Sequence, residues 1–242
     1  TQASLHTSTG SHDRELTFAK ALPHPRRTCG SGGAQAYIVS EETDEIYVVS
    51  EQGPVATLNT GNGPRGCILL GKRLFVSHLY ENHLWEFNTE NGQPVHKHAI
   101  GAPQKSLAIS TDKQTLAMAV QGPAAGAAIL DLMHPQEITH IALPLTPEWI
   151  AQGPSSLSWN LSSRHQPALI HLQQEEGKWT HTIKELSRPL TTMLASKQGT
   201  TLFAATTGYH PTAKQLRGNH YIQDQILAFD SLSLEVVGRL IT

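Results

Sequence analysis

The chain has 242 residues, of which 38% are hydrophobic and 16% are charged, and this composition is that of a globular protein rather than a disordered one. Its 18 Lys and Arg against 20 Asp and Glu give a formal charge of −2, so no basic excess exists to displace counterions, and nucleic acid is excluded as an expected partner. No apolar run approaches the roughly 18 residues of a membrane-spanning helix, so we expect no membrane span.

The first residues of the chain are predicted to be a tail followed by one strand. The chain starts at Thr1 without a Met, as either a mature chain after signal-peptide removal or a truncated chain would. We expect the first, and with it a periplasmic or extracellular location. Residues 1–14 form the tail, and residues 15–22 (ELTFAKAL) are predicted to be a strand that precedes the turn at Pro25.

From Pro25 onward a pattern of turns and short strands repeats. Residues 25–60 contain three apolar bursts separated by polar residues (YIV, IYVV and VATL), each long enough for a strand and too short for a helix. The pattern recurs in residues 63–100, 101–143, 153–186 and 187–242. Its period of about 38 to 50 residues is that of a β-propeller blade. The sequence therefore predicts an all-β fold over residues 15–242, a β-propeller of four-stranded antiparallel blades with about five blades visible.

The second repeat carries a family resemblance. Its sequence PRGCILLGKRLFVSHLYENHLWEFNTENGQPVHKHAIG resembles the YVTN-type β-propeller repeat in its Pro-Arg-Gly turn, its Lys-Arg-Leu-Phe-Val-Ser strand, its third strand ending in Asn-Thr and its closing Ile-Gly. Such repeats occur in extracytoplasmic proteins. Related propellers include amine dehydrogenase heavy chains, haem d1 proteins and propellers of quinone-dependent or cytochrome c oxidation. The resemblance implies an extracytoplasmic propeller and specifies the fold more closely than the function.

The strand count predicts a ring that does not close within these residues. The last repeat already carries its own fourth strand, residues 234–241, so residues 15–22 have no three inner strands to join. Three explanations stand beside one another. Further residues follow Thr242, a second polypeptide supplies the missing strands, or residues 15–22 are not a blade strand. Under the first two, the ring is completed by residues or a chain outside this sequence.

One face of the predicted propeller gathers the basic residues. Loops between the second and third strands and loops between blades emerge together, and loops on a rigid scaffold commonly carry function. Basic residues at the starts of four innermost strands would form a collar that suits carboxylates or phosphates, because Arg presents a fixed fork of donors. The alternative is that these loops are simply polar. The predicted ligand-binding residues are Arg27, Arg65, Lys105 and Arg188, with Tyr209 and Arg217 from a long fifth loop.

Histidines on the same face are candidate metal ligands. His78 and His83 flank a short turn, and His210 and His220 flank a ten-residue excursion in the long loop. Imidazoles above a basic collar would suit copper or a haem-type cofactor, although neither pair has the spacing of a strong metal motif. The long loop, residues 208–225, is also expected to clamp a partner or to cover the pocket.

The two cysteines are expected to be free thiols. Cys29 and Cys67 stand at matching positions near the starts of two first strands. Equivalent positions on adjacent blades usually lie farther apart than the roughly 7 Å limit between the Cα atoms of a disulfide. A disulfide would mean that the register of the first blade is displaced.

No catalytic motif appears in the sequence. It has no Gly-x-Ser-x-Gly, no Walker loop, no dinucleotide fingerprint and no Cys-x-x-Cys-His. Two functions follow. The first is a non-catalytic extracytoplasmic binding or scaffold propeller that docks a redox partner, a subunit or a second polypeptide through its His/Arg-rich face. The second is the propeller part of an oxidoreductase that holds a metal, quinone or haem-type cofactor there. The lack of a nucleophile or an acid–base constellation favours the first.

Overall fold

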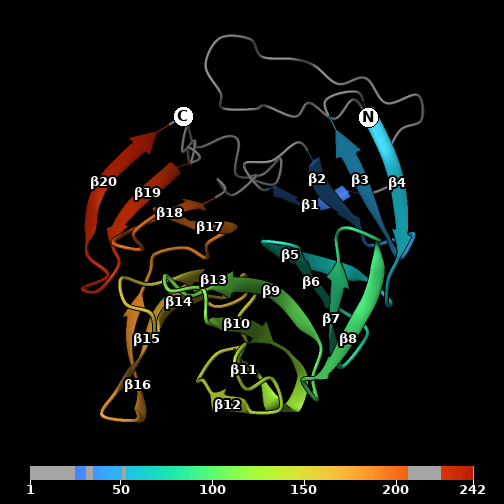
Figure 1. Cartoon of the computed structure of the whole chain (residues 1–242). Helices are drawn as coiled ribbons and strands as arrows, with labels where there is room; N and C mark the ends of the chain where they lie inside the picture. Colours follow the sequence, from blue (N-terminus) through green and yellow to red (C-terminus); the bar gives the residue numbers. More distant parts are fainter. Residues whose placement is uncertain (1–24, 31–34, 51–52, 207–224, 242) are drawn as a thin grey trace. The chain divides into compact units, whose positions relative to one another are not determined.

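Five four-stranded antiparallel sheets make up the described part of the chain and confirm the predicted all-β propeller fold (Figure 1). The structure is a computed structural model that describes residues 25–30, 35–50, 53–206 and 225–241. The tail of residues 1–14, the predicted strand at 15–22 and most of the long fifth loop lie outside these ranges. Within them, the helical structure is one three-residue 3-10 turn, η1 (Gly122–Ala124), and no helix is long and apolar enough to cross a membrane.

The chain divides into two units, residues 1–106 and residues 107–242, and each is described by itself. The first unit holds two complete blades. Blade 1 consists of β1 (Pro25–Gly30), β2 (Gln35–Ser40), β3 (Glu45–Ser50) and β4 (Gly53–Asn59). Blade 2 consists of β5 (Pro64–Leu70), β6 (Arg73–His78), β7 (His83–Asn88) and β8 (Gln93–Ala99).

The remaining blades belong to the second unit, except that the first strand of blade 3 crosses the division. Blade 3 consists of β9 (Gln104–Ile109), β10 (Thr115–Val120), β11 (Gly126–Asp131) and β12 (Ile138–Ala142). Blade 4 consists of β13 (Trp149–Gln152), β14 (Ser158–Ser162), β15 (Ala168–Glu175) and β16 (Lys178–Glu185). Blade 5 consists of β17 (Thr192–Ala195), β18 (Thr201–Thr206), β19 (Gln225–Asp230) and β20 (Val236–Ile241).

Position within a blade explains the composition of each strand. Inner strands have neighbours on both sheet faces, so they are mostly apolar, as in β10 (TLAMAV), where all six residues are buried. Outermost strands are mostly exposed and carry polar residues, as in β8, whose sequence is QPVHKHA. This gradient from the first strands to the fourth produces the bursts of apolar residues in each repeat.

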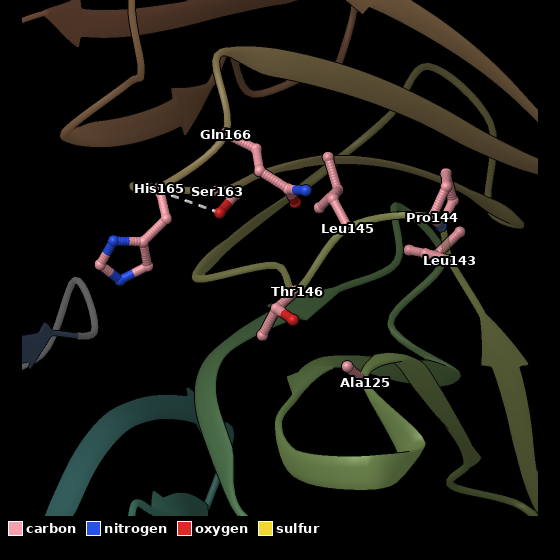
Figure 2. A pocket seen from close by; sticks show the side chains of 8 residues that line it. All are labelled: Ala125, Leu143, Pro144, Leu145, Thr146, Ser163, His165 and Gln166. Atoms are coloured by element: carbon pink, nitrogen blue, oxygen red, sulfur yellow. Dashed lines mark hydrogen bonds between the residues drawn. The ribbon is translucent and has the colours of Figure 1, made fainter.

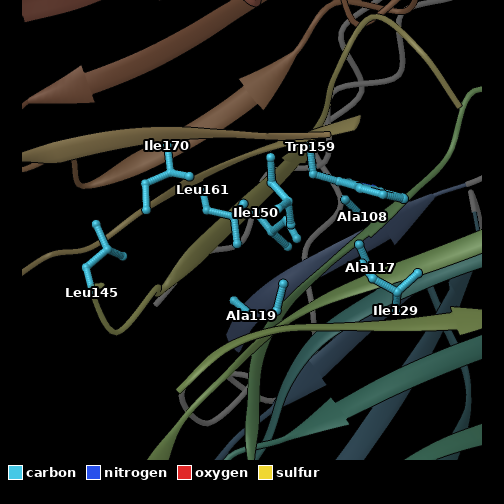
Figure 3. Close-up of a cluster of buried hydrophobic side chains, with 11 residues drawn as sticks. Ala108, Ala117, Ala119, Ile129, Leu145, Ile150, Trp159, Leu161 and Ile170 are labelled. Atoms are coloured by element: carbon cyan, nitrogen blue, oxygen red, sulfur yellow. The ribbon is translucent and has the colours of Figure 1, made fainter. Parts of the chain in front are cut away.

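The hydrophobic core lies between successive blades. In the first unit, Val39 and Ile46 of blade 1 pack with Leu74 and Phe87 of blade 2. In the second unit, Ala117 and Ile129 of blade 3 pack with Ile150, Trp159 and Leu161 of blade 4 (Figure 3). A third cluster joins blades 4 and 5 and includes Ala151, Leu169, Met193, Leu202 and Phe229. Within each unit, successive blades are thus held together by their sheet faces.

A disulfide joins Cys29 to Cys67, with 5.8 Å between their Cα atoms, so the expectation of two free thiols is wrong. The reason is the register of blade 1. Pro25 pairs with Ser40, the last residue of β2, and Pro64 pairs with His78, the last residue of β6. Pro25 and Pro64 therefore occupy equivalent positions in the two blades.

Counted from that position, the two cysteines are not equivalent. Cys67 pairs with Val76, and the residue of blade 1 that corresponds to Val76 is Ile38, whose partner is Thr28. Cys29 therefore stands one residue further along its strand than Cys67. Because a one-residue shift turns a side chain to the other sheet face, Cys29 of β1 faces blade 2, Cys67 of β5 faces blade 1, and both lie in the core between them.

Candidate functional site

In the first unit, the predicted collar residue Arg65 is held by an acidic partner. Its Nη1 atom lies 2.6 Å from Oε2 of Glu41, and the two side chains are only 15% and 12% exposed. The neighbouring loop is braced as well, because the Gly63 N–H donates to Oδ1 of Asp44 at 2.7 Å. Arg65 therefore ties the loop after β2 to the start of β5, and an external anion would have to compete with Glu41.

Both ring nitrogens of His78 are also hydrogen-bonded within the protein. Its Nε2 accepts a hydrogen bond from the Gly61 N–H at 3.1 Å and contacts the Thr60 hydroxyl at 2.8 Å, so Nδ1 carries the proton and donates to the His83 backbone carbonyl at 3.2 Å. Burial lowers the pKa of His78 to about 4, so its ring is neutral at physiological pH. The structure thus brings His78 to His83 through a backbone carbonyl, not through the two rings.

The other predicted site residues divide between half-buried positions and undescribed ones. Arg27 is half-buried, and burial lowers the pKa of its guanidinium. By the register of blade 1, Arg26 and not Arg27 corresponds to Arg65. Lys105 is half-buried in β9. The residues of the long loop, Tyr209, His210, Arg217 and His220, lie outside the described ranges. Within those ranges no group of three or more His, Cys, Asp or Glu residues could hold a metal ion.

The second unit has a hollow of about 440 Å³ on its loop side (Figure 2). Three loops line it: the one after η1, the one between β12 and β13, and the one between β14 and β15. Leu143 and Pro144 lie at one end and His165 at the other (Figure 2). The hollow therefore combines an apolar end with a polar one, as small-molecule and peptide sites do. Its lining residues are Ala125, Leu143, Pro144, Leu145, Thr146, Ser163, His165 and Gln166.

A charged pair adjoins this hollow in the sequence. Glu148 is 4% exposed, and its N–H donates to the Ser162 carbonyl at 2.8 Å. Nε of Arg164 lies 3.8 Å from Oε2 of Glu148, and the Arg164 side chain is 54% exposed. Arg164 therefore presents most of its surface to solvent beside His165.

Four buried polar atoms lie next to this region and have no hydrogen-bond partner among the described residues. They are Nε1 of Trp149, Oγ of Ser162, Nη1 of Arg188 and Oγ1 of Thr206. Buried polar groups are nearly always hydrogen-bonded, and leaving one unpaired costs about 1–3 kcal/mol. Four such atoms in one part of a fold are available to water molecules or to an external ligand.

Strand register places these four atoms at the loop end of the interface between blades 4 and 5. Trp149 and Ser162 are Cα partners at the loop ends of β13 and β14, and Trp149 packs against the core between these blades. Thr206 follows Leu202 and Ala204 at every second position of β18, and both of those residues face that core. Arg188 lies two residues before Leu190, which belongs to the same core.

The chemistry of this polar site is donor-rich. The Trp149 indole and the Arg188 guanidinium can only donate, and one of them carries a positive charge. The Ser162 and Thr206 hydroxyls donate or accept. Such a set suits a carboxylate or a phosphate oxygen. Arg188 is therefore the predicted collar residue that the structure leaves best suited to an anion.

From the sequence, Trp149 was expected only to lie in a loop between blades, and Ser162 and Thr206 were not predicted as site residues. The available signal was a hydroxyl at the last position of an otherwise apolar second strand, as in TLFAAT. That signal is weak, because β2 of blade 1 also ends with a buried hydroxyl residue, Ser40, which is not one of the four atoms of this site.

No protein-family model and no curated protein matches the chain, whereas many solved structures share its fold. Hydrazine synthase of Kuenenia stuttgartiensis aligns with a TM-score of 0.75 and 14% identity over 97% of this chain and 69% of that chain. Dihydro-heme d1 dehydrogenase NirN, solved in complex with DHE, aligns with a TM-score of 0.62 and 13% identity over 91% of this chain. The chain spans about half, 47%, of the NirN chain.

Identities this low show the fold alone. The class they define is a β-propeller whose structural neighbours include a haem d1-related protein, which agrees in part with the resemblance noted in the sequence.

Proposed function

We propose that the protein is a non-catalytic, extracytoplasmic binding propeller that docks a redox partner or subunit through the loop face of blades 4 and 5. A carboxylate of that partner is bound by Arg188 and Trp149. The observation that carries this proposal is the set of four buried polar atoms without partners at the loop end of the interface between these blades. The adjoining hollow, with Leu143 and Pro144 at one end and His165 at the other, provides surface for the rest of the partner.

Two further observations support the class and the location. The histidine that is most buried in the first unit, His78, is fully hydrogen-bonded and neutral, which suits a structural role for its ring. The Cys29–Cys67 disulfide suits an oxidising compartment, because such bonds are kept reduced in most cytosolic proteins.

The indole N–H of Trp149 gives a direct test. We would titrate the protein with citrate and with inorganic phosphate, at ionic strength matched with chloride, and follow the indole resonances by 1H–15N NMR. We expect a saturable shift of the Trp149 indole. The Trp85 indole is an internal control, because it donates to Oε2 of Glu81 at 2.9 Å and should stay in place.

Two variants make this test specific. Arg188→Gln should abolish the Trp149 shift, whereas Arg239→Gln, which removes an exposed arginine from β20, should leave it unchanged. A Trp149 resonance that ignores both anions, or that responds equally in Arg188→Gln, would contradict the proposal.

The second candidate, an oxidoreductase propeller with a haem-type cofactor, draws on the same atoms. Tetrapyrroles of the haem type carry carboxylate side chains, which the donors at Arg188 and Trp149 fit. The described residues fit the iron less well, since they form no metal-binding cluster and both ring nitrogens of His78 are occupied. Added haem whose Soret band shifts saturably with the wild type, but not with Arg188→Gln, would favour this candidate. An unchanged spectrum would exclude it.

A further inference from the structure

Blade 5 presents an apolar sheet face to solvent. On the face turned away from blade 4, two neighbouring rows of residues run across the four strands, and these two rows are here named the open face. One row is Leu194, Phe203, Ala228 and Gly238, and the other is Thr192, Ala205, Ile226 and Leu240. A third row, Thr201 of β18 and Asp230 of β19, borders them on the same sheet face. Leu194 is 67% exposed, Leu240 59%, Phe203 44% and Ile226 41%. Contiguous exposed apolar surface of this kind commonly marks an interaction site.

In blade 4 the residues at the equivalent positions are buried. In blade 4, Ala151, Asn160 and His171 are cross-strand partners in the same register as Leu194, Phe203 and Ala228 in blade 5. Ala151 is 6% exposed, Asn160 0% and His171 1%.

Blade 5 covers these residues. Ala151 belongs to the core shared with blade 5, and the Asn160 amide donates to the hydroxyl of Ser231, which follows β19. The open face of blade 5 is therefore the kind of surface by which one blade contacts the next, and among the described residues of the second unit no further sheet covers it.

The residues of the open face are arranged to fit a copy of themselves. In the first row the large residues, Leu194 and Phe203, lie on the inner strands, and the small ones, Ala228 and Gly238, on the outer strands. In the second row the order is reversed, with Ala205 inside and Ile226 and Leu240 outside. None of the eight residues is charged, and Asp230 carries its charge in the bordering row, outside these two rows.

A two-fold axis parallel to the strands, between β18 and β19, pairs large with small residues at every position. Such an axis exchanges inner and outer strands and keeps each row opposite itself. Phe203 then faces Ala228 of the second copy, Leu194 faces Gly238, Ile226 faces Ala205, and Leu240 faces Thr192. Interdigitation of large and small residues is what a well-packed sheet interface requires. We propose that the open face of blade 5 binds the open face of a second copy of this chain, forming a symmetric sheet-on-sheet dimer.

The width of the surface sets the expected strength. Four strands at about 4.8 Å spacing span about 19 Å, so the area buried per copy is at the low end for specific interfaces. We expect a dimer that forms and dissociates with concentration. This inference does not depend on the polar site at Arg188, which lies at the other face of blade 5.

Sedimentation velocity over a wide concentration series tests the proposal. We expect the mass to rise from 26.4 kDa toward twice that value. Phe203→Lys should weaken association by about tenfold or more, because it places a charge in the centre of the interface. Leu194→Lys, at the more exposed position, serves the same purpose if the first variant fails to fold. Met133→Lys is the matched control, because Met133 is 68% exposed on blade 3, and it should leave the dimer intact.

A mixing experiment tests the register itself. Ala228→Asp should weaken association to a similar extent, and an equimolar mixture of Phe203→Lys and Ala228→Asp should recover the dimer, since the two-fold axis brings these residues together. A wild type that is monomeric at all concentrations would overturn the proposal, and hydrogen exchange that showed the open face protected in that monomer would indicate that the chain itself covers it. Association unaffected by Phe203→Lys, or a mixture that stays monomeric, would overturn it as well.

Discussion

Two buried histidines each have both ring nitrogens hydrogen-bonded in this protein. His78 is bound by Gly61, Thr60 and His83, and His171 contacts Asn160 at 3.1 Å and Gln173 at 3.3 Å. Burial is the main cause that lowers the pKa of both side chains. Each histidine therefore favours its neutral form in the folded state, and both should make the fold sensitive to acid.

The pH dependence of stability should show this directly. The pKa of His78 is about 4 when folded and about 6.5 when unfolded, so between these values only the unfolded chain takes up the proton. The contribution of His78 to stability should be constant above about pH 6.5 and should fall as the pH drops to about 4, by up to roughly 3 kcal/mol. Denaturant unfolding at a series of pH values measures this slope.

Substitution identifies the group responsible. In His78→Gln the slope between pH 6.5 and 4 should become shallower, although the variant is less stable at neutral pH. His83→Gln is the control, because the His83 ring is exposed and only its backbone carbonyl bonds His78. Equal slopes in wild type and His78→Gln would show that the neutral state of this ring does not control acid sensitivity.

Two glycines in turns of the second unit offer a matched comparison. Both have positive φ, +71° at Gly199 and +78° at Gly177. A Cβ at Gly199 would lie 1.9 Å from the Gly153 carbonyl oxygen, a backbone atom that cannot move aside, whereas a Cβ at Gly177 would meet nothing within 4 Å. Gly177→Ala should cost about 1 kcal/mol for its backbone conformation alone. Gly199→Ala should cost several times more, because the turn between β17 and β18 must move away from blade 4.

Thermal or chemical denaturation of the two glycine variants measures this difference. Similar losses would mean that the close approach of the Gly199 turn to Gly153 is relaxed without cost.

At the scale of strands, the sequence predicted the number and type of elements well and their register less well. Apolar bursts, turns and the repeat period were enough for five blades of four strands, because most buried inner strands are rich in apolar residues. The equivalence of β1 and β5 was misjudged, because the two cysteines were matched with each other. Pro25 matches Pro64 in the structure, and Cys29 lies four residues after its proline whereas Cys67 lies three after its own. This one-residue error exchanged Arg26 for Arg27 and separated two cysteines that are bonded.

The candidate site shows the same limit. Arg188 was predicted because arginines recur at blade starts. Glu41 could not be predicted as the partner of Arg65, because the two residues are 24 positions apart and meet only through the fold. Ser162 and Thr206 became visible only once register placed them at the interface between blades.

The disulfide between β1 and β5 should contribute substantially to stability. It closes a sequence separation of 38 residues, for which loop-closure entropy gives about 4 kcal/mol. The wild type should lose up to this amount in denaturant unfolding when reductant is added. A Cys29→Ala, Cys67→Ala variant should be less stable to denaturant even without reductant, and reductant should not change its stability. Alkylation before reduction should label neither cysteine, and labelled native protein would contradict the bond.

At the scale of the whole molecule, the covalent bond and the polar site belong to different units. Cys29 and Cys67 both lie in residues 1–106, whereas Trp149, Ser162, Arg188 and Thr206 lie in residues 107–242. Reduction should therefore raise hydrogen–deuterium exchange in peptides from blades 1 and 2 and leave the inner strands of blades 4 and 5 unchanged. A uniform increase across both units would show that they unfold as one cooperative body.

The same bond gives the chain a mechanical property. If the folded chain is pulled apart at its two ends, the 38-residue span between the bonded cysteines cannot extend while the bond is intact. At about 3.5 Å per residue, this withholds about 130 Å of contour length. A single oxidised molecule in an optical trap should unfold to a length shorter by that amount than a reduced one. Tension and reductant would then act in sequence. Force first separates the sheets and exposes the two sulfur atoms, and reduction of the disulfide then allows the remaining 38-residue span to extend.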